Sequence, residues 1–393
     1  MIEFPDPILW VIIVIASVWL YRACRVIISH HSIPIVRPRN PKSALSSTRI
    51  TVLIPVKNEE KNIRDCLECF SHQDHPHIQI IVANDSSTDR TEEILKSMDI
   101  PRIGDNDGQR PEHKIAYFNC PPTPSGWTGK NYALHTVVPF ARGDWFLFTD
   151  ADTRHDPHSI SSSLQHAESR DLEYLTLTPR CIADTFVERF ILPLAMLSLG
   201  MHFPLDKVNH PDSEMTFGNG QYLMIKRGVY EKIEGHDKVR AEFLEDYAIT
   251  KNVKALGARF ECAIGTEIYG TRMYDSFDTI WIGWRRIILH AFRKNILVMS
   301  KYFFNVLLFS VFPFLAFIPL TLLTVADPYV FGFSWCMGFT VLFFILITNW
   351  KAFAFVKAQK AYALFHPLSA FFIAMILMDA IWIAVSKKET KWR

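Results

Sequence analysis

Residues 8–21 (ILWVIIVIASVWLY) carry no charged side chain, and this run constrains the fold more than any other segment of the chain. With residues 4–7 it is just long enough to span a bilayer. It lacks a basic start and a small-residue cleavage site, so we expect a retained membrane anchor within residues 1–25 rather than a signal peptide. Acidic residues precede the run and basic residues follow it, so the positive-inside rule places the next domain in the cytoplasm.

The last third of the chain contains three further apolar stretches, at 302–326, 329–350 and 365–385. The first two are joined by an Asp-Pro turn and predict a membrane hairpin, and all three fall in a C-terminal transmembrane region, residues 301–393. Basic residues lie on both sides of the third stretch, so the charge rule leaves its orientation open.

Two other segments have the composition of helices at a membrane surface. Residues 275–300 mix tryptophan and aliphatic side chains with arginine and lysine, which is typical of an amphipathic interfacial helix. Residues 186–204 are strongly apolar but are interrupted by Pro193. They predict either a second interfacial helix that faces lipid or a buried helix of the central domain.

The middle of the chain has the pattern of an α/β domain. Hydrophobic residues make up 49% of the chain, but the excess lies at its two ends, and residues 26–49 form a linker rich in proline, serine and basic side chains. Between residues 50 and 274, apolar strands alternate with amphipathic helices, which predicts a mostly parallel sheet with helices on both faces. The net charge of +2 points to no nucleic-acid partner, and seven scattered cysteines suit a reducing compartment.

The expected elements of this domain are short. We expect strands at 50–55, 78–83, 115–118, 145–149 and 173–178, and helices at 58–70, 88–98, 130–141 and 157–169.

Two of these strands end in polar turns. The first leads into the turn from Pro55 to Glu59, and the second is followed directly by Asp85. In an open α/β sheet, ligands bind beyond the carboxyl ends of the strands. We therefore expect both turns at a ligand site, with Asp85 accepting hydrogen bonds from a ribose or a base.

The fourth expected strand ends in Asp150 and Asp152. Two carboxylates this close repel each other unless a cation lies between them, and Mg²⁺ or Mn²⁺ prefers few carboxylates together with phosphate oxygens and water. The pair predicts a divalent metal that bridges to a diphosphate and stabilises it as a leaving group.

Three more candidates stand near the start of expected helices. Lys130 can meet an anionic phosphate or a sugar carboxylate there, although an ordinary exposed lysine is an equal alternative. Glu245 and Asp246 open a helix that runs to about residue 256. The helix dipole alone favours both carboxylates. Inverting sugar transfer, however, needs one carboxylate base to deprotonate the acceptor hydroxyl, and Asp246 is the candidate, with Glu245 beside it.

Four motifs follow one another along the central domain: PVKNEE (55–60), NDSSTD (84–89), DAD (150–152) and LED (244–246). Together they resemble the family 2 glycosyltransferases with the GT-A fold, a Rossmann-like α/β domain with a mostly parallel sheet. The stretches GWTGKNYAL, GNGQYLMI, EGHDKVRAEFLED and TRMYDSFDTIWIGW are similar to the membrane-bound subgroup that includes hopanoid-associated and carotenoid (diaponeurosporenoate-type) glycosyltransferases.

The resemblance implies roles for residues of this sequence. Pro55, Glu59 and Asp85 are expected to hold the nucleotide, and Lys130 and Gln221 are further candidates for contact with the donor. Asp152 is expected to hold the metal, with Asp150 near the ribose or the sugar, and Asp246 is expected to act as the base.

One departure from the family pattern lies after the Glu-Asp pair. Processive members carry a Gln-x-x-Arg-Trp signature, whereas this chain has WIGWRR at 281–286. We expect Trp284 to flank the acceptor and Arg285 or Arg286 to lie by the diphosphate.

These features predict an integral membrane enzyme that moves one sugar from a UDP- or GDP-sugar to a lipid hydroxyl or carboxyl, with inversion. A processive polysaccharide synthase is an alternative that the missing signature and the few spans disfavour. A non-catalytic membrane scaffold is disfavoured because Asp152 and Asp246 are both present. A transporter that uses Asp379 inside the membrane is the third alternative, and the three or four expected spans are few for it.

Overall fold

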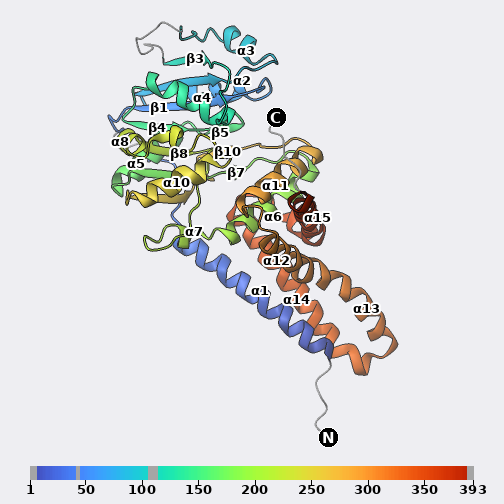
Figure 1. The fold of residues 1–393 in the computed structure, drawn as a ribbon. Helices are drawn as coiled ribbons and strands as arrows, with labels where there is room; N and C mark the ends of the chain where they lie inside the picture. Colours follow the sequence, from blue (N-terminus) through green and yellow to red (C-terminus); the bar gives the residue numbers. More distant parts are fainter. Residues whose placement is uncertain (1–6, 41–44, 105–113, 387–393) are drawn as a thin grey trace. The chain divides into compact units, whose positions relative to one another are not determined.

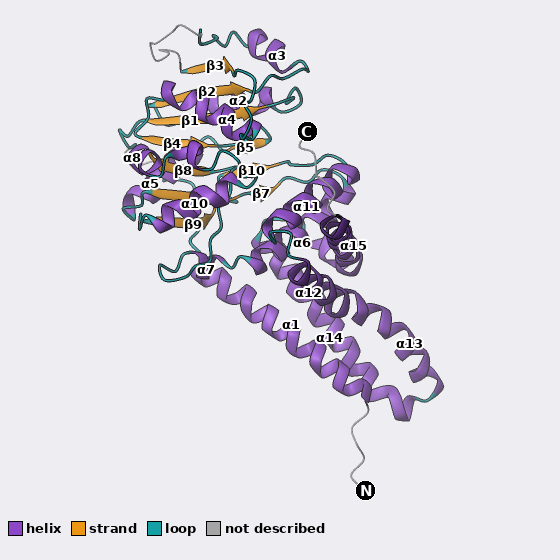
Figure 2. Ribbon diagram, viewed as in Figure 1, coloured by secondary structure: helices purple, strands orange, loops and turns teal. Residues whose placement is uncertain are grey.

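The computed structural model describes residues 7–40, 45–104 and 114–386, which separate into two compact units. The sheet unit comprises residues 33–182 and 203–273. The helical unit comprises the described parts of 1–32, 183–202 and 274–393. Figures 1 and 2 show strands in the first unit and helices alone in the second.

A seven-stranded sheet in the order β3-β2-β1-β4-β8-β6-β9 forms the centre of the sheet unit. All neighbouring strands are parallel except β8, which runs antiparallel to β4 and β6. The predicted α/β class with a mostly parallel sheet is therefore confirmed. The strands of this sheet are β1 (Ile50–Val56), β2 (Ile78–Asn84), β3 (Ile115–Asn119), β4 (Trp145–Phe148), β6 (Tyr174–Thr178), β8 (Leu223–Lys226) and β9 (Phe260–Ile264).

A second sheet has three short strands in the order β5-β10-β7, namely β5 (Thr153–His155), β10 (Tyr269–Thr271) and β7 (Arg180–Cys181). The helices of the sheet unit are α2 (Ile63–Ser71), α3 (Thr91–Ser97), α4 (Gly129–Val137), α5 (Ser159–Ser169), α7 (Leu205–Val208), α8 (Arg227–Lys232), α9 (Gly235–Lys238) and α10 (Glu245–Ala255), with a 3₁₀ turn at Val138–Phe140.

The alternation of side chains along β1 explains why helices cover both faces of the large sheet. Val52 and Ile54 enter one apolar cluster, which also contains Phe70 of α2. Leu53 points to the opposite face and joins a second cluster with Leu134 of α4. Successive strand residues point to opposite faces, so a strand with apolar side chains on both faces requires cover on both sides.

The first strand ends in a longer turn than predicted. The helix expected over 58–70 begins only at Ile63. Asn58 adopts a left-handed backbone (φ 58°), and its side-chain oxygen accepts a hydrogen bond from the Thr88 backbone N–H. This conformation cannot continue into a right-handed helix, so Glu59 lies in the turn.

The helical unit consists of α1 (Pro7–Ser32), α6 (Phe186–His202), α11 (Phe277–Ala291), α12 (Ile296–Val306), a π-helix at Leu307–Val311, α13 (Phe312–Ala326), α14 (Pro328–Phe355), a 3₁₀ turn at Lys360–Phe365 and α15 (His366–Ser386). Among the described residues, five helical segments are long and apolar enough to cross a membrane: Pro7–Ile28, Phe186–Val208, Ile296–Ala326, Pro328–Phe355 and Lys360–Ser386. The 186–204 segment thus qualifies by length and composition as a possible span as well as an interfacial helix.

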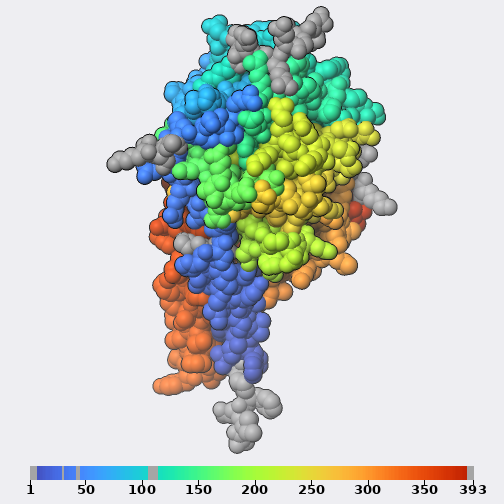
Figure 3. Space-filling model, turned by 90° about the vertical axis from the view of Figure 1, so that its left-hand side faces the viewer, coloured from blue at the N-terminus to red at the C-terminus, as the bar shows by residue number. Residues whose placement is uncertain are grey.

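Helix α1 keeps a large apolar surface outside the bundle. Ile12, Ile15 and Trp19 pack against α13 and α14, whereas Trp10 and Leu20 remain 58% exposed. Figure 3 shows α1 in blue beside the orange helices of the same unit. An apolar helix face of this kind is typical of a segment that contacts lipid.

The prediction of one continuous helix over 275–300 is wrong. Helix α11 ends at Ala291, and α12 begins at Ile296 after the cap residue Asn295. Arg293 and Lys294 have positive φ values of 50° and 54°, and left-handed residues end a right-handed helix.

A polar cluster connects α11 to α15 within the helical unit. Asp379 accepts hydrogen bonds from the Trp281 indole N–H (2.7 Å) and from Arg285 Nη1 (3.0 Å). The charge of Asp379 is thus balanced inside this unit, which favours a structural role for it over a role in transport.

Replacement of Asp379 by alanine should destabilise the protein by roughly 1–3 kcal/mol, because Arg285 then stays half-buried without its partner. The double variant Arg285→Met/Asp379→Leu should lose less, since neither charge remains. Thermal unfolding of the detergent-solubilised protein measures both. Equal midpoints for wild type and Asp379→Ala would contradict the structural role.

Candidate active site

Three parallel strands deliver acidic residues to one edge of the sheet. β1, β2 and β4 lie side by side, and Val56 of β1 is opposite Asn84 of β2. The backbone N–H of Asp85 donates to the Val56 carbonyl (2.9 Å), so the turns after β1 and β2 are held together. The DAD turn follows β4 at the same edge, as expected for the carboxyl ends of parallel strands.

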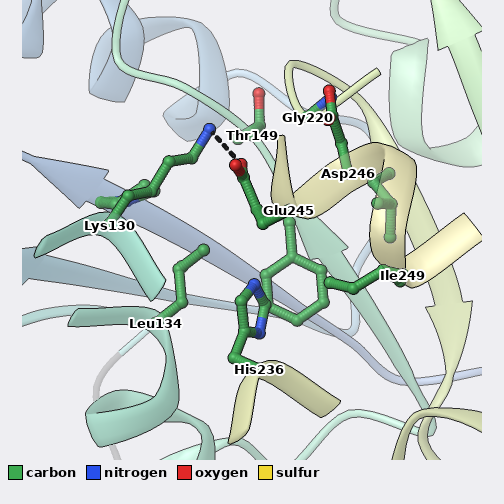
Figure 4. Close-up of a pocket in the computed structure, with 11 residues that line it drawn as sticks. Lys130, Leu134, Thr149, Gly220, His236, Glu245, Asp246 and Ile249 are labelled. Atoms are coloured by element: carbon green, nitrogen blue, oxygen red, sulfur yellow. Dashed lines mark hydrogen bonds and ion pairs between the residues drawn. The ribbon is translucent and has the colours of Figure 1, made fainter. Parts of the chain in front are cut away.

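Lys130 joins two of the predicted acidic residues. Its Nζ lies 2.7 Å from Asp150 Oδ1 and 2.8 Å from Glu245 Oε1. Figure 4 shows Lys130 and Glu245 pointing toward each other from different helices. Burial alone lowers the pKa of the Lys130 ammonium, but the carboxylates of Asp150 and Glu245 outweigh it and raise that pKa above its ordinary value. Lys130 is therefore charged, and the alternative of an ordinary exposed lysine is excluded.

Asp246 is held by two backbone donors. The Gly220 N–H donates to its Oδ2 (2.8 Å), and the Tyr247 N–H donates to its Oδ1 (2.7 Å). Burial and the nearby Glu245 carboxylate raise the pKa of Asp246 to about 7. Both effects disfavour the charged form more than the hydrogen bonds favour it.

Gly218 and Gly220 leave the space that this arrangement needs. A Cβ on Gly220 would lie 3.2 Å from both Lys130 Nζ and Glu245 Oε1, and a Cβ on Gly218 would overlap the backbone of Asp246. Neither glycine has a positive φ. The requirement is therefore for close approach and not for an unusual backbone conformation.

Asp152 accepts a hydrogen bond from a residue of β10, a strand that was not predicted from the sequence. Thr271 of β10 donates from Oγ1 to Asp152 Oδ1 (3.4 Å) and accepts from Gln221 Nε2 (3.0 Å). Burial, Asp150 and Glu59 raise the pKa of Asp152 to about 7. The structure thus links Gln221 to the DAD turn through Thr271, to which the sequence motifs assigned no individual role.

The acidic residues of the DAD turn fit a divalent cation. Within the residues that the structure describes, no group of three or more Asp, Glu, His or Cys side chains could hold a metal by itself. Asp150 and Asp152 supply two carboxylates, and burial together with the nearby Asp150 and Glu59 carboxylates raises the pKa of Asp152. Mg²⁺ and Mn²⁺ accept few protein carboxylates when phosphate oxygens complete the shell, so this pair suits a metal that binds together with a diphosphate.

A small cavity lies beside these groups and includes a histidine that sequence reasoning missed (Figure 4). His236 is buried there, and its Nδ1 lies 2.6 Å from the Tyr230 hydroxyl. Burial and the charge of Lys130 lower the pKa of His236 to about 3, so it is neutral. Pro55 also lines this cavity.

The turn after β2 forms its own polar group. Asp85 is buried, and its Oδ2 lies 3.0 Å from Lys57 Nζ. A Cβ on Gly129 would overlap the Asp85 carboxylate, so the start of α4 is in contact with it. Glu59 lies in the turn after β1, and its backbone N–H donates to Thr91 Oγ1 (2.8 Å).

Three predicted residues belong to the other unit. Trp284, Arg285 and Arg286 are on α11 of the helical unit. Arg285 is paired with Asp379, and Trp284 is buried. Their expected contacts with acceptor and diphosphate stay predictions.

The mostly parallel sheet with helices on both faces is a fold of the GT-A kind. Residues 51–234 match the model of glycosyl transferase family 2, so the chain carries a domain of that family. The resemblance drawn from the four motifs is thereby confirmed.

The chain is 24% identical over 243 residues to a 4,4'-diaponeurosporenoate glycosyltransferase of Staphylococcus haemolyticus and 23% identical over 244 residues to one of Staphylococcus aureus. Each match covers 60% of this chain and 60% of the length of the relative. Among solved structures, it resembles the mannosyltransferase PcManGT from Pyrobaculum calidifontis in complex with GDP-Man and Mn²⁺. That likeness has a TM-score of 0.52 and 16% identity, and it covers 97% of this chain and 100% of the other.

Alanine substitutions at three glycines should rank by the space around each. Gly218→Ala should be the most destabilising, because the Cβ meets backbone, and Gly220→Ala should cost about 1–3 kcal/mol through overpacking. Gly228→Ala is the control, since a Cβ there meets nothing within 4 Å. Thermal unfolding measures the order, and a Gly218→Ala protein as stable as Gly228→Ala would contradict the close approach.

Proposed function

We propose that this protein is a membrane-bound, metal-dependent inverting glycosyltransferase. It moves a sugar from a UDP- or GDP-sugar to a lipid-like acceptor, and its catalytic domain faces the cytoplasm. One observation carries the proposal: carboxylates from the DAD turn and from the start of α10 meet at a single ammonium, Lys130, at the ligand-binding edge of an α/β sheet.

The donor binds along the turns after β1, β2 and β4. Pro55, Glu59 and Asp85 bind the nucleotide, and Gln221 supports the DAD turn through Thr271. Asp150 and Asp152 would hold Mg²⁺ or Mn²⁺, and the metal would supply positive charge that stabilises a diphosphate leaving group. The likeness to a fold solved with GDP-Man and Mn²⁺ supports this assignment.

Asp246 is the general base. Backbone N–H groups of Gly220 and Tyr247 fix both of its oxygens, so the carboxylate has one orientation. It takes the proton of the acceptor hydroxyl as that oxygen bonds to the anomeric carbon. The bond from that carbon to the diphosphate breaks on the opposite face, which inverts the configuration. A pKa of about 7 suits a base that works near neutral pH.

Five helical segments within the described residues are able to cross a membrane, and this supports a lipid-like acceptor. The relatives named for transfer to a carotenoid acid support this class of acceptor. A lipid acceptor stays in the bilayer while its polar end reaches the sugar.

A panel of UDP- and GDP-sugars tests the proposal. The full-length protein in membranes is incubated with each donor, Mn²⁺ and a lipid extract, and new glycolipids are detected by mass analysis. Asp152→Ala should abolish metal-dependent transfer, whereas Asp212→Ala, at a highly exposed site, should retain it. No product with any donor would overturn the function, and full activity in Asp152→Ala would remove the metal role.

The rate should follow the protonation of Asp246. Only the deprotonated carboxylate accepts a proton, so kcat/KM at saturating Mn²⁺ should fall about tenfold per pH unit below pH 7 and level off above it. Asp246→Asn should lose roughly 10²–10⁴-fold in rate and no longer show this step. Asp237→Asn, at an exposed site, is the control. An unchanged profile in Asp246→Asn would assign the base elsewhere.

A further inference from the structure

Lys130 places an ammonium at hydrogen-bond distance from one of the carboxylates proposed to bind the metal. Its Nζ lies 2.7 Å from Asp150, and Asp150 is one of the two carboxylates assigned to the metal. Within the described part of the sheet unit, Lys130 also reaches Glu245 at the start of α10 (2.8 Å). One ammonium therefore bridges the metal turn and the helix that carries the base.

The position of this ammonium is fixed by its helix. Thr128 caps α4 by accepting from the Asn131 N–H (3.3 Å). Asn131 is fully buried, and its side-chain amide donates to the carbonyls of Val239 (2.7 Å) and Glu242 (3.0 Å). These contacts hold the first turn of α4, and Lys130 is about four-fifths buried. The ammonium cannot move far without leaving both carboxylates.

We propose that Lys130 is the internal counter-cation of the donor-free site, which keeps the affinity for a free divalent cation low until a nucleoside diphosphate arrives with its own charge. This inference rests on the proposed function and deepens it by assigning the order in which metal and donor bind. Lys130 is a positioning residue in this account, because it acts through Asp150 and Glu245.

Charge decides the order of binding. In the free site, a divalent cation beside Asp150 is repelled by an ammonium at hydrogen-bond distance from the same carboxylate. A diphosphate brings further negative oxygens, and these attract both cations and complete the coordination of the metal. The metal and the nucleotide therefore bind with positive coupling, which is reciprocal between the two ligands.

The ion pair with Lys130 also gives Glu245 a positioning role. Glu245 precedes Asp246 in the first turn of α10, so its ion pair with Lys130 fixes the start of that helix. The Gly220 N–H then meets Asp246 from the other side (2.8 Å). Lys130 thus sets the positions of the metal turn and the base together.

Mn²⁺ binding to the full-length protein in detergent tests this proposal, with free Mn²⁺ followed by electron paramagnetic resonance. The wild type should bind Mn²⁺ weakly alone and more tightly with UDP or GDP. Lys130→Met, which keeps the apolar stem and removes the charge, should bind Mn²⁺ alone at least about tenfold more tightly than the wild type. Lys130→Arg keeps the charge and should behave as the wild type does.

Two further variants control for folding and for the loss of a lysine. Lys130→Met/Glu245→Gln removes the charge left without a partner, and it should also bind Mn²⁺ alone more tightly. Lys96→Met removes an exposed lysine that pairs with Glu92 and should leave Mn²⁺ affinity unchanged. The Mn²⁺ concentration that raises the unfolding temperature gives a second measure of each affinity.

Equal Mn²⁺ affinity of Lys130→Met, its double variant and the wild type would overturn the inference. Tight Mn²⁺ binding by the wild type without nucleotide would overturn it as well. The measurement needs no sugar transfer, so it decides the inference even if the proposed function fails. A protein that behaves as expected here but transfers no sugar from any donor would instead overturn the function alone.

Discussion

The site depends on placing several carboxylates at one edge of a sheet without enough positive charge to balance them. Asp150 and Glu245 share the Lys130 ammonium, which satisfies two acidic groups with one cation. Among the described residues, no ion pair is formed by Asp152 or Asp246, and burial beside like charges raises the pKa of each to about 7 although Lys130 acts in the opposite direction. Burying several carboxylates close together lowers the stability of the protein when no ligand is bound. This arrangement is suited to a ligand that brings positive charge, and this is the basis on which a metal and a base are proposed at these residues.

The rest of the sheet unit serves to hold these groups at close range. Parallel strands bring the turns after β1, β2 and β4 to one edge, and the apolar side chains on both faces of β1 require helices on both sides. Gly218 and Gly220 let the loop before β8 approach α10, so that a backbone N–H can reach Asp246. Thr271 donates a hydrogen bond to Asp152 and accepts one from Gln221, so it connects the two residues. Each of these contacts joins segments that are distant along the chain.

The helical unit follows a different rule, since its apolar side chains face outward as well as inward. Helix α1 buries one stripe and leaves large side chains exposed on the other. A polar residue in such helices needs a partner nearby, and Asp379 finds one in Arg285 and another in Trp281. The ion pair gives α15 and α11 a fixed relation inside this unit, and it assigns Arg285 a partner that the sequence pattern did not suggest.

The sequence by itself determined the elements that local patterns encode. Apolar runs gave the membrane-spanning candidates, and the alternation of strands and helices gave the mostly parallel sheet. The acidic motifs at strand ends predicted Asp85, Asp150 and Asp152, and the Glu-Asp pair at a helix start predicted Asp246, because strand ends and helix starts are local features. Only the tertiary structure decided which side chains meet. The bridge from Lys130 to both Asp150 and Glu245, the Thr271 contact and the Arg285–Asp379 pair join residues 20 to 119 positions apart in the chain. No local pattern encodes such contacts, since they follow from the order of the strands and the packing of helices upon them.

The break between α11 and α12 was missed for a related reason. Arg293 and Lys294 are ordinary helix formers, and nothing in their residue types signals a left-handed backbone.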